Sequence, residues 1–256
     1  MRKTVQAICV LGSILFAAGC ATIPDDSVSE ACTTVIALYT DVPVRMDGRL
    51  DDPVWRDAPA YPLHLAADVD PGGLDDVQEP GEARFAWDDD NLYIAIHYTD
   101  SDVVAEGEHD NDMHFTMGDV GEVFIKPDGN TLYWELYVTP HGMKSAFFFP
   151  SWSRSLPSSF DYTMDLHVAA KVDGSLNDWT DRDKGWTGEM AIPRAELEQY
   201  GDAFPGEGWS ILVARYNYGR YLEKQGAELT MMPRLPMTSY HYHPGYARLE
   251  LRREVR

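Results

Sequence analysis

The fold is decided by residues 118–139, which read GDVGEVFIKPDGNTLYWELYVT. The first arm, residues 122–126, is short, apolar and rich in β-branched side chains, as strands are. Residues 127–130 (PDGN) are typical of a turn, because Pro presets φ while Gly and Asn tolerate positive φ. The return arm, residues 131–139, alternates apolar and polar side chains. The stretch therefore predicts a β-hairpin.

The return arm has two different faces, because successive side chains of a strand point in opposite directions. The face that fits a core carries Leu132, Trp134, Leu136 and Val138. The opposite face carries Tyr133, Glu135, Tyr137 and Thr139. An aromatic and acidic face suits a polar, ring-shaped ligand, but aromatic side chains also pair with one another across strands. Both explanations stay open at this point.

The rest of the chain repeats the pattern of short strands separated by turn residues. Strands are expected at residues 35–39, 83–87, 92–98, 144–149, 166–172, 185–193, 209–218 and 247–251. Brief helical turns are expected after Pro53 and at residues 194–200, with loops at residues 100–114 and 151–159. The pattern predicts an all-β protein, an antiparallel sandwich of immunoglobulin-like or jelly-roll-like type with one or two short helices.

The first residues resemble an export signal. A charged start precedes an apolar run at residues 5–18, which is too short to span a membrane comfortably and ends in LFAAGC at residues 15–20. Small residues before a Cys resemble a bacterial lipoprotein signal, which makes Cys20 the predicted lipidation site. We therefore expect a signal peptide at residues 1–19, a tether at 20–36 and one domain at 37–256. An ordinary cleaved signal peptide is the alternative.

The predicted location is thus the cell envelope, lipid-anchored at the outer membrane or the periplasmic face. The formal net charge of -21 excludes a nucleic acid as a natural partner, and suits neutral ligands, Ca²⁺ or solubility alone. The three cysteines are Cys9, Cys20 and Cys32, which is too few for a disulfide framework. The oligomeric state is left open.

Separated motifs form one pattern along the chain. They read MDGRLDDPVW at residues 46–55, AWDDDNLY at 86–93, DVGEVFI at 119–125, GWTGEMAIP at 185–193 and PGYARL at 244–249. Their order and spacing resemble the family 9 carbohydrate-binding modules and their DOMON-like relatives. The resemblance implies a β-sandwich that binds a saccharide between two aromatic platforms with polar side chains, and that often holds structural Ca²⁺. It predicts non-catalytic binding of a polysaccharide or glycan.

The resemblance also implies site residues. Glu122 matches a ligand-contacting Glu, and Tyr240 lies near the position of a platform Trp. The other platform position is Thr116, next to Phe115, and Glu135 replaces an expected Arg. With residues on neighbouring segments, the candidate ligand contacts are Phe115, Glu122, Glu135, Trp152, Arg215, Asn217, Tyr240 and His243.

Other chemistries remain open. Asp88, Asp89 and Asp90 could supply oxygen ligands to Ca²⁺. Met113, His114 and Met117 could be axial ligands of a haem, which is the electron-transfer alternative. A glycoside hydrolase would need a pair of carboxylates, and 42 acidic residues single out no pair. Residues 240–243 (YHYH), if extended, would place two Tyr and two His on opposite sides.

Overall fold

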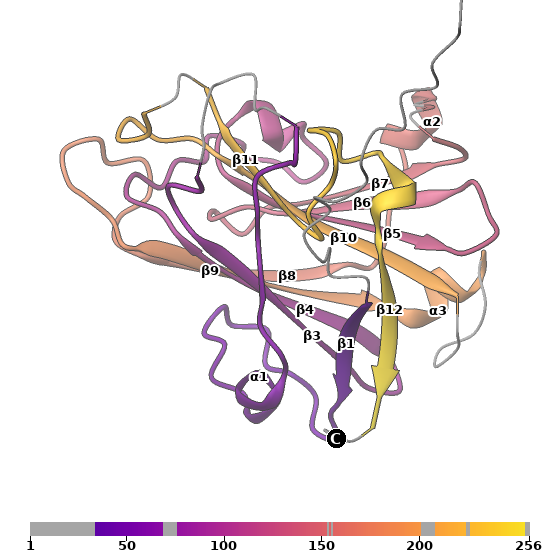
Figure 1. Cartoon of the computed structure of the whole chain (residues 1–256). Helices are drawn as coiled ribbons and strands as arrows, with labels where there is room; N and C mark the ends of the chain where they lie inside the picture. Colours follow the sequence, from indigo (N-terminus) through magenta and orange to yellow (C-terminus); the bar gives the residue numbers. More distant parts are fainter. Residues whose placement is uncertain are drawn as a thin grey trace, which may run out of the picture.

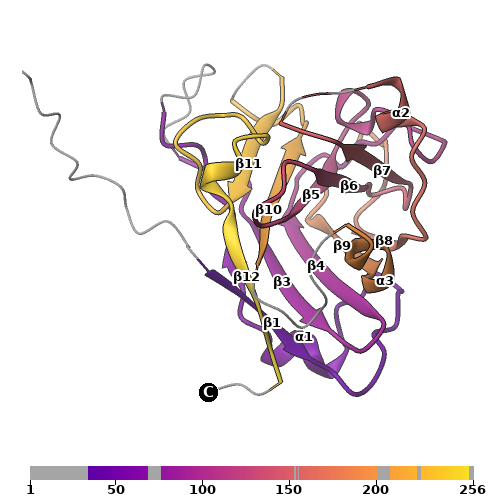
Figure 2. The same ribbon diagram turned by 90° about the vertical axis from the view of Figure 1, so that its right-hand side faces the viewer.

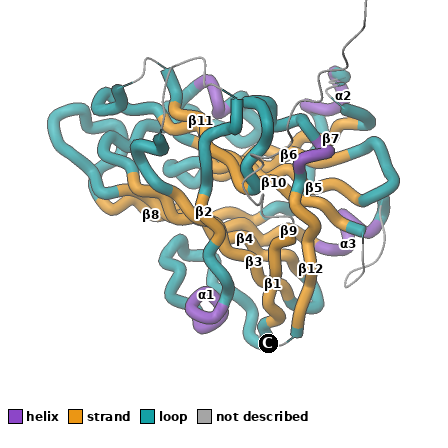
Figure 3. The backbone as a smooth tube through the Cα atoms, in the orientation of Figure 1, coloured by secondary structure: helices purple, strands orange, loops and turns teal. Residues whose placement is uncertain are grey.

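The computed structural model describes residues 34–68, 76–152, 154, 156–200, 208–223 and 226–253, and within them the protein is built mainly from strands (Figure 3). The strands are β1 (Thr34–Tyr39), β2 (Tyr61–Pro62), β3 (Gly81–Trp87), β4 (Asn91–Thr99), β5 (Val120–Pro127), β6 (Tyr133–Val138), β7 (Lys144–Phe149), β8 (His167–Asp173), β9 (Gly185–Pro193), β10 (Trp209–Asn217), β11 (Glu228–Met232) and β12 (Ala247–Arg252). The helices are α1 (Pro53–Asp57), α2 (Pro157–Phe160) and α3 (Arg194–Glu198), with 3-10 turns η1 (His114–Thr116) and η2 (His243–Gly245). The all-β prediction is confirmed.

The strands form one curled sheet in the order β7-β6-β5-β10-β12-β1-β3-β4-β9-β8, with β11 beside β10 and β2 beside β3 (Figures 1 and 2). Among the described strands, β1 alone departs from antiparallel pairing, since it lies parallel to both β12 and β3. It therefore joins two halves that would otherwise each expose an unpaired edge. Because the sheet curls, the halves face each other like the layers of a sandwich, and both contribute to one core.

The β5–β6 hairpin is confirmed, with Glu122 opposite Tyr137 and Ile125 opposite Trp134. Trp134, Leu136 and Val138 lie in the core between the halves. Tyr133 and Tyr137 belong to a separate apolar cluster on the opposite face of the sheet. The alternation in the sequence therefore predicts both faces correctly.

Two covering segments bury the outer faces. Residues 44–58, including α1, cover β3, β4 and β9. There Trp55 donates its indole N–H to Glu189 Oε1 at 3.0 Å, while the backbone N–H of Gly48 donates to Glu189 Oε2 at 2.7 Å. This contact joins the motifs at 46–55 and 185–193 in space.

The second cover lies over β5, β6, β10 and β11. The segment before β12 brings Leu235, Tyr240, Tyr242 and Tyr246 onto this face, where they pack against the strands (Figure 2). Their cover is incomplete, and the open part is the pocket described below.

Several local expectations need correction. Strands β2 and β11 and helix α2 were not expected, because each is very short or lies among loop residues. Residues 240–243 form a turn leading into η2 rather than an extended segment. The last residues of the expected tether, 34–36, belong to β1, and Cys20 lies outside the described residues. In the part of the chain that the structure describes, no helix has the length and apolar character needed to cross a membrane.

A buried polar network joins the end of β10 to the loops that follow β2 and β4. Arg215 is fully buried, and its Nη2 atom lies 2.9 Å from Asp100 Oδ2 and 2.8 Å from Asn217 Oδ1. Its Nη1 atom donates to the carbonyl oxygens of Glu79 and Thr99 at 3.0 Å each. Arg215 thus satisfies acceptors that would otherwise be buried without partners.

Replacing Arg215 by Met should destabilise the fold strongly, because Asp100 would stay buried without its counter-ion. We expect Arg215→Met to lower the free energy of unfolding by about 3–5 kcal/mol, measured by urea denaturation at neutral pH. The matched control is Arg220→Met, which removes a partly exposed ion pair with Asp102 and should cost about 1 kcal/mol or less. Equal losses in the two variants would contradict the structural role of Arg215.

Candidate functional site

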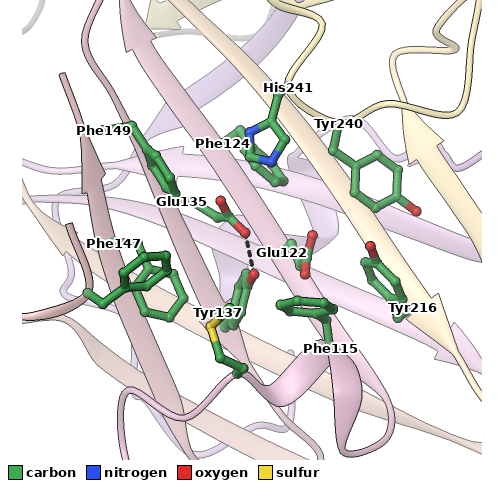
Figure 4. A pocket seen from close by; sticks show the side chains of 12 residues that line it. Phe115, Glu122, Phe124, Glu135, Tyr137, Phe147, Phe149, Tyr216, Tyr240 and His241 are labelled. Carbon is green, nitrogen blue, oxygen red and sulfur yellow. Dashed lines mark hydrogen bonds between the residues drawn. The ribbon is translucent and has the colours of Figure 1, made fainter. Parts of the chain in front are cut away.

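The candidate site is a pocket of about 320 Å³ on the outer face of the sheet (Figure 4). The described residues that line it are Met113, Phe115, Glu122, Phe124, Glu135, Tyr137, Phe147, Phe149, Phe160, Tyr216, Tyr240 and His241. Its volume is at the lower end of the range of about 300–1,000 Å³ that is usual for small-molecule sites. Most of the lining is aromatic, and the floor carries two carboxyl groups.

Strand alternation builds the floor. Every second residue of three neighbouring strands faces the pocket: Glu122 and Phe124 on β5, Glu135 and Tyr137 on β6, and Phe147 and Phe149 on β7. The residues between them face the core. The two carboxyl groups are therefore held by the same hydrogen-bonded register that builds the sheet.

The walls come from other elements. Phe115 of η1 lies 5.5 Å from Tyr216 of β10, and Tyr216 lies 5.7 Å from Tyr240, measured between ring centroids. On the other side, Phe160 of α2 meets Phe147 edge to face at 5.4 Å. Tyr240 is fixed by its hydroxyl group, which donates to the carbonyl oxygen of Arg215 at 2.9 Å. The rings are thus positioned by contacts that need no ligand.

The two carboxyl groups are almost fully buried. Glu122 is 2% exposed and Glu135 is 7% exposed. The hydroxyl group of Tyr137 donates to Glu135 Oε1, whereas Glu122 Oε1 has no hydrogen-bond partner within the described structure. Figure 4 shows the Glu122 carboxyl group among the rings of Phe115, Tyr216 and Tyr240. A buried acceptor without a partner is costly, which favours a ligand that donates to it.

Burial also changes the protonation of the pair. Desolvation raises the pKa of Glu135 to about 7, against the opposing hydrogen bond from Tyr137. Desolvation, and then the neighbouring charge of Glu135, raise the pKa of Glu122 well above its usual range. Burial lowers the pKa of His241, so this ring is neutral at neutral pH. Burial therefore favours the protonated form of Glu122.

The structure brings together four of the expected ligand contacts: Phe115, Glu122, Glu135 and Tyr240. Trp152 and His243 lie outside the lining. Trp152 is 55% exposed and lies 6.2 Å from the ring of His243, on the segment that follows β7.

Arg215 and Asn217 lie on the other side of the sheet. Their side chains belong to the buried network with Asp100, whereas Tyr216 between them lines the pocket. The reason is the two-residue period of β10, which sends these neighbours to opposite faces. Their contacts give them a structural role rather than one in this pocket.

Sequence reasoning missed Phe124, Phe147, Phe149, Phe160, Tyr216 and His241 as lining residues. One signal was available for β7, because the run 147–149 must send its first and last Phe to one face and the middle one to the other. Phe160 ends the one-turn helix α2 and His241 lies in a turn, and neither segment is long enough to show periodicity, so pattern alone does not place them.

The acidic turn at 88–90 is closed by hydrogen bonds of its own. Asp88 Oδ1 accepts the N–H groups of Asp90 and Asn91 at 2.8 and 2.7 Å, and its Oδ2 accepts the hydroxyl of Tyr93 at 2.6 Å. The carboxylate of Asp88 is thus already used to close the turn. No group of three or more His, Cys, Asp or Glu is arranged to hold a metal ion within the described residues.

The haem alternative rested on Met113, His114 and Met117. Met113 lines the pocket, while His114 is buried beside Gly107 and Met117 is partly exposed. Burial lowers the pKa of His114, and the negative charges of Asp112 and Asp110 oppose this shift.

The raised pKa of Glu135 predicts a specific pH dependence of stability. The folded protein binds the Glu135 proton more tightly than an unfolded chain, whose value is near 4.5, so this contribution is present at low pH and lost as pH rises through about 7. Glu135→Gln removes the ionisable group. We expect its free energy of unfolding, relative to the parent, to rise by about 2–3 kcal/mol between pH 5 and pH 8.

Urea denaturation at both pH values measures this difference. The exposed Glu108→Gln is the control, and should stay parallel to the parent across the range. A Glu135→Gln curve that also stays parallel would show that this carboxyl group titrates normally.

Comparison with known proteins places this geometry in a family. The model of the carbohydrate family 9 binding domain-like family matches residues 46–200. The fold is similar to a putative carbohydrate-binding protein from Bacteroides uniformis ATCC 8492, with a TM-score of 0.60 and 13% identity over 86% of this chain and 99% of that chain.

It is also similar to a family 9 carbohydrate-binding module from Caldicellulosiruptor kristjanssonii. For the structure in complex with cellotriose, the TM-score is 0.57, with 12% identity over 87% of this chain and 95% of that chain. For the structure in complex with glucose, the TM-score is 0.55, with 12% identity over 87% of this chain and 97% of that chain. No curated protein matches the chain. The family model nevertheless covers more than half of the sequence, and the chain belongs to the carbohydrate family 9 binding domain-like family.

Proposed function

We propose that the protein binds a saccharide without cleaving it, in the pocket over β5, β6, β7 and β10. The observation that carries the proposal is the combination of aromatic walls with a carboxyl floor in a cavity of about 320 Å³. The solved modules with cellotriose and with glucose support it, since they share the fold.

The chemistry of the lining suits a sugar ring. A pyranose has apolar C–H faces that pack on aromatic rings, and a rim of hydroxyl groups that hydrogen-bond to polar atoms. Phe115 and Tyr216 offer rings, while Glu122 and Glu135 offer oxygen atoms at the floor. The volume limits the occupant to a short saccharide or the end of a chain.

Binding should be tested directly with a panel of polysaccharides and short oligosaccharides. Affinity electrophoresis and calorimetry measure binding, and the same incubations can be analysed for released sugar. We expect binding without release. Release of product would favour a hydrolase, for which Glu122 and Glu135 would be the carboxyl pair to test, and failure of every saccharide to bind would refute the proposal.

Removing one wall ring should weaken binding selectively. Tyr216→Ala deletes a ring that packs against both Phe115 and Tyr240, and we expect about a tenfold loss of saccharide affinity, equivalent to about 1.4 kcal/mol. The control is Trp179→Ala, an aromatic residue that is 75% exposed and lies outside the pocket lining. Loss of affinity in the control but not in Tyr216→Ala would place the site elsewhere.

We also propose that Cys20 carries a lipid anchor that holds this binding module at the cell envelope. The support is the sequence LFAAGC at residues 15–20. In the native host, Cys20→Ser should move the protein from the detergent phase to the aqueous phase in a detergent-partitioning experiment. A parent protein already found in the aqueous phase would overturn this proposal.

A further inference from the structure

The described lining of the pocket contains two acids but neither Lys nor Arg. Glu122 and Glu135 supply its carboxyl groups. Glu122 is only 2% exposed, and its Oε1 atom lacks a hydrogen-bond partner among the described residues. An unpartnered buried carboxyl oxygen beside a second acid marks a place where a positive group would be stabilised.

Nearby cations of the protein do not fill this role. Arg215 lies on the opposite face of the sheet and pairs with Asp100. Lys126 lies further along β5, where its Nζ atom donates to the carbonyl oxygen of Pro127 at 3.0 Å. His241 faces the pocket but is neutral, because burial lowers its pKa. Within the described residues, then, no protein cation pairs with the two acids, and a ligand is the source of positive charge that we consider.

The rings around Glu122 strengthen this conclusion. Phe115, Tyr216 and Tyr240 surround its carboxyl group (Figure 4), and their spacing of 5.5–5.7 Å between neighbouring centroids is that of a packed aromatic wall. Aromatic faces attract cations, and ring-lined cages with acidic groups are a general solution for binding ammonium groups. A neutral hydroxyl group gains nothing from this attraction.

We propose that the saccharide bound here carries a protonated amino group, which lies at Glu122 and Glu135. The inference rests on the proposed saccharide binding and specifies the ligand class. An ammonium group brings three N–H donors, enough for Glu122 Oε1 and the second acid together. It also turns the unfavourable pair of buried acids into a charge-assisted contact.

Proton release should accompany binding. The titratable groups near the two acids are Tyr137 on β6, Tyr216 and Tyr218 on and after β10, and Tyr240, His241 and Tyr246 on the covering segment. Burial raises the pKa of each tyrosine, which keeps its hydroxyl group neutral, and lowers the pKa of His241, which keeps its ring uncharged at neutral pH. A bound ammonium is then the charge that draws a proton off the carboxyl pair.

Matched oligosaccharides test the proposal. Glucosamine oligomers and cello-oligosaccharides of equal length share one backbone and differ in an amino or a hydroxyl group at C2, and N-acetylglucosamine oligomers block the charge. By calorimetry at pH 6, where the amine is protonated in solution, we expect the glucosamine oligomer to bind at least about tenfold more tightly than either neutral partner. Repeating the titration in buffers of different ionisation enthalpy should show proton release with the amine alone.

The outcomes separate this inference from the proposed function. Neutral oligosaccharides that bind as well as the amine would overturn the inference and leave saccharide binding intact. Failure of all three series, with no binding across the wider panel, would overturn both. Tetramethylammonium has the charge without the sugar, and equal affinity for it would refute a saccharide ligand.

Variants test which residues recognise the amine. Glu135→Gln and Glu122→Gln should each bring the ratio of amine to neutral affinity toward one, because each removes a carboxyl group that can ionise beside the ammonium and keeps the shape of the side chain. The control is Glu250→Gln, which removes a carboxyl group on β12, outside the pocket. This variant should show the same affinity ratio as the parent. A ratio that falls equally in Glu250→Gln would assign the preference to the overall charge instead of the pocket.

Discussion

The two-residue period of β5 and β6 is the constraint on which the rest of the structure depends. Both faces of this hairpin are buried, so each residue has one acceptable side: Trp134 lies in the core, Glu135 lines the pocket, and Tyr133 packs in the apolar cluster on the pocket's face of the sheet. A slip of one residue would place Glu135 in the core and Trp134 in the pocket. The same register that stabilises the sheet thus also determines which side chains a ligand meets.

The pocket exists because the cover of this face is incomplete. Leu235 and Tyr246 seal part of it, as α1 seals the opposite half of the sheet. Full closure would bury more apolar area and would stabilise the fold further. The protein instead keeps Glu122 and Glu135 beneath an opening, at a cost in desolvation that protonation reduces. Binding sites commonly carry such local losses of stability.

The sequence predicts the secondary structure and the buried faces well wherever a strand alternates between two kinds of side chain. The hairpin and most strands follow from local patterns, whereas the contact between Trp55 and Glu189, which joins two motifs, appears only in the structure. Arg215 shows the limit. Residues 209–218 read as a strand from their composition, but which face is buried depends on the register of β10 against β5. Phe160, at the end of the short helix α2, and His241, in a turn, reach the pocket along connecting segments whose paths depend on distant packing.

Charge acts on ligand choice at two ranges. The net charge of -21 repels anionic polymers over distances up to the screening length, about 8 Å in physiological salt. Inside the pocket, screening is weak, so the contact with Glu122 and Glu135 dominates there. Both effects disfavour negatively charged glycans, such as sulfated glycans or those with uronic acids. The net charge repels them as they approach the protein, and the two carboxyl groups repel them at the floor of the pocket. The overall charge of the protein would attract any cation equally. The buried pair of carboxyl groups instead selects a cation that is attached to a group small enough to fit among the aromatic rings.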